Sequence, residues 1–177
     1  MIVQKFGGTA VADADRLNRA AEIVAAARER RPVVVVSALG GVTDLLTVAI
    51  EEAVAGRKDA LEPVLAELER RHRWALSGGC TDAGRRHDLE LEVGASFEDL
   101  RQLLRSVRVL GEVTARARDT LLAFGERLSS RSLVAALHGA GVDAEWFDPT
   151  IVLATDATFG TATPDPVRTR EHCSRTI

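Results

Sequence analysis

Ile2-Val3-Gln4-Lys5-Phe6-Gly7-Gly8-Thr9 opens the chain as a short apolar run that ends in a lysine, two glycines and a hydroxyl residue. A long helical pattern follows. Glycines let the backbone approach a ligand closely because they carry no Cβ. The free N–H groups at a helix start attract anions. This order of strand, glycine turn and helix start predicts a phosphate-binding loop.

Lys5 is unusual in this sequence because lysine is rare here. All of the 23 basic residues except Lys5 and Lys58 are arginines. A compact ammonium beside two glycines suits a phosphate oxygen better than a wide guanidinium does. The motif matches neither the Walker nor the dinucleotide pattern, so an ordinary lysine before a tight turn is an open alternative.

The next residues predict a βαβ unit. Apolar residues recur at helical spacing over residues 17–27, Asp13 or Asp15 can cap this helix, and Pro32 ends it. Val33-Val34-Val35-Val36 is an unbroken β-branched run, typical of a strand covered on both faces. Strand, helix and strand in this order predict a parallel sheet with a right-handed crossover.

A second glycine loop, Ser37-Ala38-Leu39-Gly40-Gly41-Val42-Thr43-Asp44, follows the second strand and precedes a helix predicted over residues 45–55. Ligands of open parallel sheets bind beyond the carboxyl ends of the strands. Both glycine loops are therefore expected at one sheet edge. Ser37 and Thr43 are candidate ligands there, although turn chemistry and an N-cap role for Thr43 explain them equally well.

Helical patterns continue over residues 59–76, 85–109 and 112–138. A loop is expected at residues 77–80. His72 and His87 lie among charged residues, so a solvated surface position is expected for both.

The last of these helical patterns contains Gly125. A glycine in a helix lowers stability by about 1 kcal/mol relative to alanine, which indicates that something approaches the backbone there. Glu126 next to it can bind an amine, or it can pair on the helix surface with Arg127 or Ser130.

The end of the chain is expected to add two strands, at residues 144–148 and 151–153. Residues 155–165 form a polar loop with too little apolar content for a core. A helix is expected from Val167.

Overall composition excludes several classes of protein. A net charge of -3 and a pI near 5.8 give no general attraction to nucleic acid or to an anionic membrane. No apolar run approaches the roughly 20 residues that span a bilayer, and no secretory signal is visible. Cys80 and Cys173 lack metal-site spacing, so we expect no metal ligands and a cytoplasmic location.

Several segments together resemble the aspartate kinases. Lys5-Phe6-Gly7-Gly8-Thr9 is similar to the opening signature of that family, usually Lys-Phe-Gly-Gly-Thr-Ser, and residues 35–46 are similar to its second signature. Phe124-Gly125-Glu126-Arg127-Leu128-Ser129 matches its Gly-Glu segment, and residues 146–148 and 159–165 match a later stretch. The matches occur in family order along the whole chain, which is more specific than any single motif.

The resemblance implies the amino-acid kinase (carbamate kinase-like) fold, a three-layer α/β/α sandwich. It implies phosphoryl transfer from ATP with Mg²⁺ to the side-chain carboxylate of L-aspartate, the first step toward lysine, threonine and methionine. By position, Lys5, Gly7, Gly8 and Thr9 would bind the phosphates of ATP, with Lys5 as the catalytic residue. Ser37, Thr43 and Glu126 would hold the amino acid. Ala10 stands where the family usually has serine, so a hydroxyl contact is lost there.

The implied chemistry agrees with these residue types. A carboxylate nucleophile is already ionised at neutral pH and needs no general base. Positioning and charge neutralisation must then supply most of the catalysis. A lysine with glycine amides, hydroxyl donors and one carboxylate can provide both.

Residues 1–177 are expected to be the N-terminal, amino-acid-binding part of such a catalytic domain, incomplete at the C-terminus. Nothing in them resembles an adenine or ribose site, and the regulatory domains of the family are absent. We therefore expect the chain alone to expose an apolar sheet face, to self-associate and to show little kinase activity. For the complete enzyme, the resemblance implies a homo-oligomer.

Three alternatives remain at this point. The chain could belong to another enzyme of the same fold, acting on glutamate, acetylglutamate, carbamate or a nucleotide. It could be a non-catalytic amino-acid-binding or interaction module derived from such a kinase. The complete gene could also be bifunctional, joined to another biosynthetic enzyme.

Overall fold

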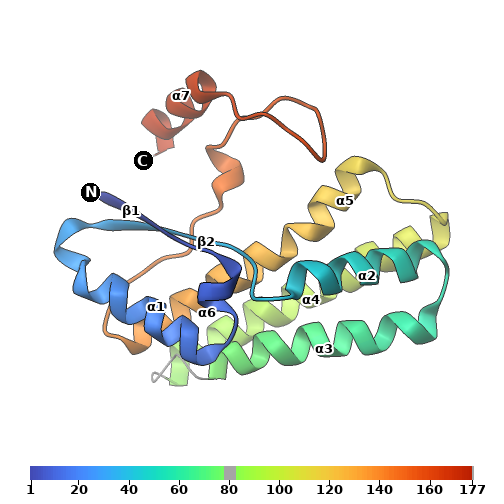
Figure 1. The fold of residues 1–177 in the computed structure, drawn as a ribbon, viewed down its shortest axis with the longest axis horizontal. Helices are drawn as coiled ribbons and strands as arrows, with labels where there is room; N and C mark the ends of the chain where they lie inside the picture. Colours follow the sequence, from blue (N-terminus) through green and yellow to red (C-terminus); the bar gives the residue numbers. More distant parts are fainter. Residues whose placement is uncertain (78–82, 177) are drawn as a thin grey trace.

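The computed structural model describes residues 1–77 and 83–176. The loop predicted at residues 77–80 lies largely outside these residues, as does Cys80. A small parallel sheet lies at one end of a body of long helices, and the C-terminal segment crosses beside it (Figure 1).

The sheet consists of β1 (Ile2–Phe6) and β2 (Pro32–Val36), which are parallel and pair from Ile2 with Pro32 to Phe6 with Val36. Between them lie a 3-10 turn, η1 (Gly8–Val11), helix α1 (Ala14–Ala26) and a second 3-10 turn, η2 (Arg28–Arg30). The predicted βαβ unit is confirmed.

Asp13 caps α1, as one of the two predicted alternatives stated. Its side-chain oxygen accepts a hydrogen bond of 2.9 Å from the N–H of Arg16. An N-cap of this kind satisfies one of the backbone donors that the first helical turn leaves unpaired.

The two faces of the sheet differ. Phe6, Val34 and Val36 are partly buried and pack against the main hydrophobic core. On the other face, Val3 is 69% exposed, and Val33 and Val35 are 48% and 47% exposed. The prediction that β2 is covered on both faces is therefore wrong for these residues, and the predicted exposed apolar face is present.

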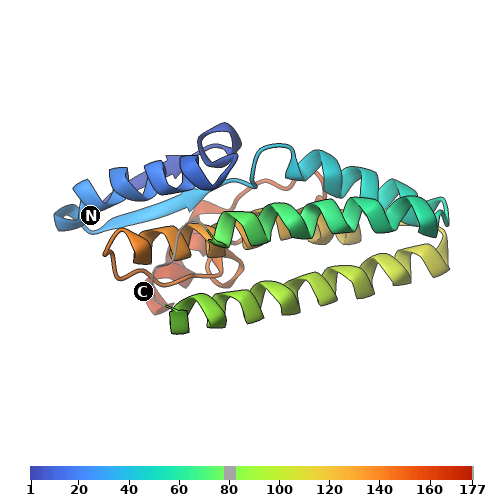
Figure 2. The ribbon, with the colours of Figure 1, turned by 90° about the horizontal axis from the view of Figure 1, so that it is seen from below.

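Helices form the rest of the body: α2 (Val42–Val54), α3 (Lys58–Ser77), α4 (Ala83–Leu110), α5 (Ala115–Leu122) and α6 (Phe124–Gly139). Figure 2 shows α3 and α4 running side by side in opposite directions. The single pattern at residues 112–138 is divided at Ala123 into two helices. None of the helices in the described residues is long and apolar enough to cross a membrane.

Helix α2 starts earlier than predicted, and its N-cap is Gly41, with φ of 75°. Thr43 lies inside the first turn, so the N-cap interpretation of Thr43 is wrong. A glycine suits the cap position because this positive φ strains residues with a Cβ.

His72 is buried, which contradicts its predicted place on the surface, whereas His87 is exposed. The His72 ring lies edge-on to Phe97, with ring centroids 5.6 Å apart, and its Nδ1 is 2.8 Å from the carbonyl oxygen of Leu68. Burial lowers the pKa of His72 to about 4. Arg70 and Arg73 are exposed, because they lie on other sides of α3 than His72.

The two strands predicted near the end of the chain are absent from the described residues. Residues 144–148 form no strand; Trp146 instead packs on α6 and donates a 2.8 Å hydrogen bond to Ser130 Oγ. Residues 151–153 fall in and after the 3-10 turn η3 (Pro149–Ile151). The polar loop after them and helix α7 (Pro166–Thr176) are confirmed, with one isolated bridge between Thr155 and Pro164.

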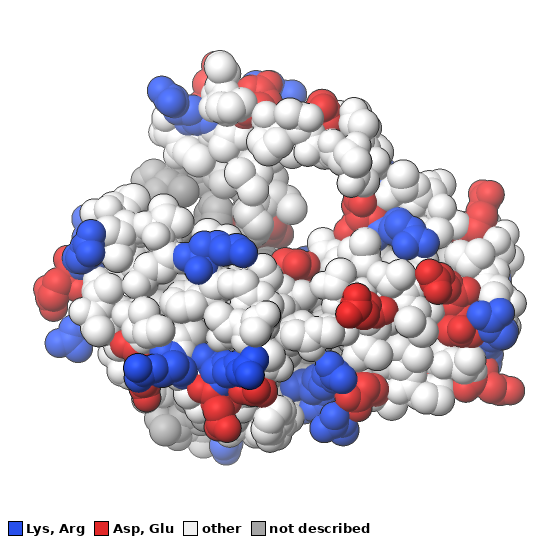
Figure 3. Space-filling model, in the orientation of Figure 1, with Lys and Arg blue, Asp and Glu red and all other residues white. Residues whose placement is uncertain are grey.

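Basic and acidic side chains are interspersed on the face seen in Figure 3. This mixture agrees with the small net charge of -3. The surface chemistry in this view therefore offers no broad basic patch of the kind that binds a polyanion.

Candidate functional site

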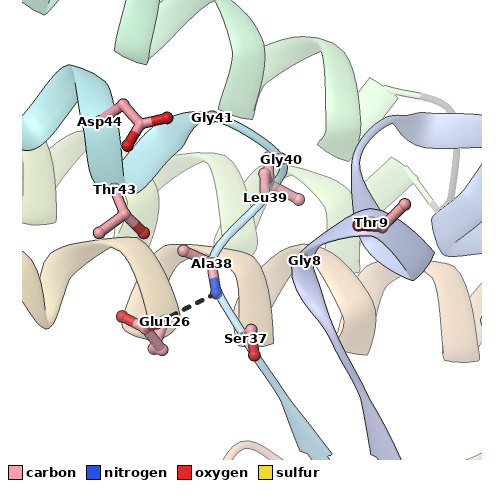
Figure 4. A pocket seen from close by; sticks show the side chains of 10 residues that line it. All are labelled: Gly8, Thr9, Ser37, Ala38, Leu39, Gly40, Gly41, Thr43, Asp44 and Glu126. Carbon is pink, nitrogen blue, oxygen red and sulfur yellow. Dashed lines mark hydrogen bonds between the residues drawn. The ribbon is translucent and has the colours of Figure 1, made fainter.

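A cavity of about 400 Å³ opens at the carboxyl ends of the two strands. Figure 4 shows the loop after β2 passing between Glu126 on one side and the loop after β1 on the other. The lining residues are Gly8, Thr9, Ser37, Ala38, Leu39, Gly40, Gly41, Thr43, Asp44 and Glu126. The predicted meeting of both glycine loops at one sheet edge is confirmed.

Close packing at this edge depends on glycines. A Cβ on Gly8 would lie 3.0 Å from the carbonyl oxygen of Ala38, and one on Gly40 would lie 2.8 Å from the Cβ of Ala12. A Cβ on Gly125 would lie 2.8 Å from that of Ala38. The predicted close approach at Gly125 is therefore confirmed, and the approaching group is the second glycine loop itself.

Glu126 and Ser129, both on α6, hold the start of this loop. Glu126 Oε1 accepts a 3.3 Å hydrogen bond from the N–H of Ala38, and Ser129 Oγ donates a 2.7 Å bond to the carbonyl oxygen of Ser37. Glu126 thus pairs with neither Arg127 nor Ser130, the alternative that the sequence left open. Its carboxylate is exposed and lines the cavity, so it can still accept from a ligand.

Lys5 lies next to the cavity but does not line it. Its ammonium would be 3.5 Å from a Cβ on Gly7, so the side chain runs along β1 toward the glycine loop. Because strand side chains alternate, Lys5 and Gly7 share a face of the sheet. No acidic side chain pairs with this ammonium in the described residues, and its charge is available to an anion.

Thr9, Ser37 and Thr43 place three hydroxyl groups around the cavity. Thr9 and Thr43 are exposed and Ser37 is half-buried. The ladder continues one residue past β2, since the N–H of Ser37 donates to the carbonyl oxygen of Phe6 at 3.1 Å. The backbone of Ser37 is therefore fixed while its hydroxyl remains free to donate.

Asp44 is a cavity residue that the sequence reasoning did not select. It directly follows Thr43 in the first turn of α2, and this adjacency was the available signal. A carboxylate near a helix N-terminus is stabilised by the helix dipole. Together with Glu126 it gives the cavity a second group that attracts an ammonium.

No cluster of three or more His, Cys, Asp or Glu side chains capable of holding a metal occurs within residues 1–77 and 83–176. The chemical features of the cavity are therefore hydroxyl donors, backbone amides and two carboxylates, with one ammonium nearby. Such a set suits a small zwitterion that carries carboxylates.

Comparison of the sequence with known proteins identifies its family and its relatives. The sequence model of the amino acid kinase family matches residues 1–171. The chloroplastic aspartokinase 1 of Arabidopsis thaliana is 35% identical over 153 residues, which cover 82% of this chain and 25% of that protein. The lysine-sensitive aspartokinase 3 of Escherichia coli K12 is 33% identical over 174 residues, covering 93% and 34%. The chain thus spans no more than about a third of these curated relatives.

The fold is shared with solved aspartokinases. The structure of E. coli aspartokinase III in complex with lysine and aspartate matches with a TM-score of 0.88 and 28% identity, over 99% of this chain and 37% of that chain. The same enzyme in complex with aspartate and ADP gives equal values. Aspartate kinase from Clostridium acetobutylicum, at 19% identity and a TM-score of 0.71, supports the fold alone.

These matches confirm the predicted amino-acid kinase fold and the resemblance to aspartokinases. The roles predicted for individual site residues remain predictions. With nearly its whole length matched by one family model, the chain belongs to the amino acid kinase family.

Proposed function

We propose that the chain forms the amino-acid-binding part of an aspartate kinase, which transfers a phosphoryl group from ATP to the side-chain carboxylate of L-aspartate. The observation that carries this proposal is the cavity at the two glycine loops, which three hydroxyl groups and the carboxylate of Glu126 line together. The E. coli relative with this fold has been solved with aspartate and with ADP. A role in lysine, threonine and methionine synthesis and a cytoplasmic location are part of the same proposal.

In this proposal, the ammonium of L-aspartate binds Glu126, and its carboxylates accept hydrogen bonds from Ser37 and Thr43. Glu126 is suited to this role because its Oε1 already bonds the Ala38 N–H, which fixes the carboxylate at the cavity wall. Its second oxygen is then free for the substrate. Charge-assisted hydrogen bonds of this kind are stronger than neutral ones.

The phosphate end of ATP fits the opposite side of the cavity. The unpaired ammonium of Lys5 lies beside Gly7, and Gly8, which packs against the carbonyl oxygen of Ala38, lines the cavity next to it. Mg²⁺, when bound with ATP, would neutralise further phosphate charge. The residues of this chain contribute positioning and charge, and no general base is needed because the attacking carboxylate is ionised.

Calorimetric titration of the purified chain with L-aspartate tests the amino-acid half of the proposal. We expect L-aspartate to bind the wild type, and its affinity for Glu126→Gln to be roughly tenfold lower, as expected for the loss of a charged hydrogen bond. Succinate, which lacks the ammonium, is the matched ligand: its binding should not weaken in Glu126→Gln. Equal losses for both ligands, or no aspartate binding at all, would contradict the assignment.

Trapping of the acyl phosphate with hydroxylamine tests the kinase half. We expect little product from the 177-residue chain with MgATP and L-aspartate, because the proposed ATP site is completed by residues outside it. Strong turnover by this chain would refute that view. Aspartate binding without ATP binding in a protein that carries the whole catalytic domain would favour a binding module, and a preference for glutamate or acetylglutamate would favour another kinase of the family.

A further inference from the structure

Arg71, on α3, reaches the second glycine loop from outside the cavity. Its Nη1 donates a hydrogen bond of 3.0 Å to the carbonyl oxygen of Gly40. Gly40 and Gly41 line the cavity, whereas Arg71 does not. The side chain therefore contacts the outer side of a loop whose inner side forms the site.

This contact fixes the orientation of the peptide between Gly40 and Gly41. A peptide unit is planar and trans, so a carbonyl held toward α3 turns the N–H of Gly41 in the opposite direction. Two consecutive glycines impose little steric restraint on that orientation. The N–H of Gly41 has no acceptor among the described residues, which leaves it available to a ligand.

The Arg71 side chain is itself anchored. Its Nε donates to Glu67 Oε1 at 2.7 Å, one helical turn earlier. Hydrogen bonds from Arg70 and Arg71 lower the pKa of Glu67 to about 2, so this carboxylate remains charged at neutral pH. A Cβ at Gly41 would lie 3.1 Å from Arg71 Nη1, so the guanidinium sits directly against the loop.

We propose that Arg71, anchored by Glu67, is a positioning residue that holds the Gly40–Gly41 peptide with its N–H available to a carboxylate of the bound amino acid. The amino-acid ligand rests on the proposed function. The conformational part, that Arg71 restrains residues 39–42, rests on the contacts alone. Arg71 does not touch the substrate in this arrangement.

Arg70 provides a matched control within the same helix. It donates two hydrogen bonds to Glu67, of 2.7 and 2.8 Å, but it is exposed and makes no hydrogen bond to the loop. Arg70→Ala therefore removes the same charge and an ion pair with the same partner. The difference between Arg71→Ala and Arg70→Ala isolates the contact with the loop.

The test combines two measurements on the purified chain: amide hydrogen exchange of Val42 without ligand, whose N–H donates to the carbonyl oxygen of Leu39 at 3.0 Å across this loop, and the Kd for L-aspartate. In Arg71→Ala we expect exchange about tenfold faster and a Kd about tenfold larger. A change of this size is expected for the loss of one charged hydrogen bond. Arg71→Lys should recover part of both effects, and Glu67→Gln should show smaller changes in the same direction. Arg70→Ala should match the wild type in both.

Equal exchange and equal Kd in Arg71→Ala and Arg70→Ala would overturn the proposal. If Arg71→Ala fails to fold, Glu67→Gln is compared with Arg70→Ala instead. An exchange rate in Glu67→Gln equal to that of the wild type would contradict the proposal that Glu67 anchors Arg71. A wild-type chain that binds no L-aspartate would refute the proposed function, while the exchange comparison would still decide the role of Arg71.

Discussion

Gly125 offers a direct test of how the site is assembled. Replacing it by alanine would place a Cβ 2.8 Å from the Cβ of Ala38, and 3.4 Å from side-chain atoms of Val42 and Leu46. The first distance is shorter than real Cβ contacts allow. Ala38 cannot move away without a cost in free energy, because its Cβ is attached directly to a loop that hydrogen bonds hold at both Ser37 and Ala38.

The expected free-energy change is the difference of two terms. Overpacking a well-packed site costs typically 1–3 kcal/mol. Alanine in place of glycine gains about 1 kcal/mol in a helix interior, and less here because Gly125 is the second residue of α6. We therefore expect Gly125→Ala to lower the free energy of unfolding by about 1–2 kcal/mol. For a chain of this size, that corresponds to a melting temperature lower by about 3–6 °C.

Gly94 is the matched control for this substitution. It lies inside α4, and a Cβ there would meet nothing within 4 Å. The same change, Gly94→Ala, should therefore show only the gain in helix propensity and raise the melting temperature by about 3 °C. Thermal unfolding of both variants, followed by circular dichroism, measures the contrast. A rise in Gly125→Ala similar to that in Gly94→Ala would refute the packing argument.

The further predictions concern charge, titration and one buried hydroxyl. Lys5→Ala should reduce aspartyl phosphate formation by roughly two or more orders of magnitude in a form with the whole catalytic domain, while Lys58→Ala should not; near-normal turnover in Lys5→Ala counts against a catalytic role. The pKa of His72 is about 4 in the folded chain, against an ordinary value of about 6.5. Between pH 4 and 6.5, the unfolded chain therefore binds more protons than the folded chain. The free energy of unfolding should thus fall by up to about 3 kcal/mol as the pH decreases from about 6.5 to 4. Denaturant titrations across this range should show a flatter profile for His72→Gln and an unchanged one for His87→Gln. Ser129→Ala should lower the free energy of unfolding by about 1–2 kcal/mol, measured by the same titrations; no change would show that its hydrogen bond to the end of β2 adds no stability.

The βαβ unit and the two glycine loops could be predicted because each depends on local pattern. The valine run, the helical spacing before it and Pro32 determine strand and helix boundaries with little help from the rest of the chain. Because the two strands are parallel, their carboxyl ends, and with them both loops, lie at one sheet edge. Gly125 was also informative, because a glycine inside the predicted helical pattern of residues 112–138 is costly unless another segment approaches it.

The errors have a common physical origin in packing between distant segments. Residues 144–148 have a strand-like composition, but a strand also needs a partner, and Trp146 instead packs on Arg131 with 3.9 Å between the guanidinium carbon and the ring centroid. His72 has charged neighbours in sequence, yet its own position on α3 faces Phe97. Neither outcome is encoded in the residues adjacent to the segment concerned.

Arg71 extends this reasoning to function. In the sequence it is one of several arginines in a charged helical stretch, and no motif distinguishes it from Arg70. The difference arises because Arg71 is at the edge of the helix that faces the loop after β2, where it donates to Gly40. A flexible glycine pair allows the backbone to approach a ligand but does not choose one conformation, so the choice must come from a contact outside the loop. In this fold, α3 supplies that contact, and the charge of Glu67 keeps the guanidinium in place.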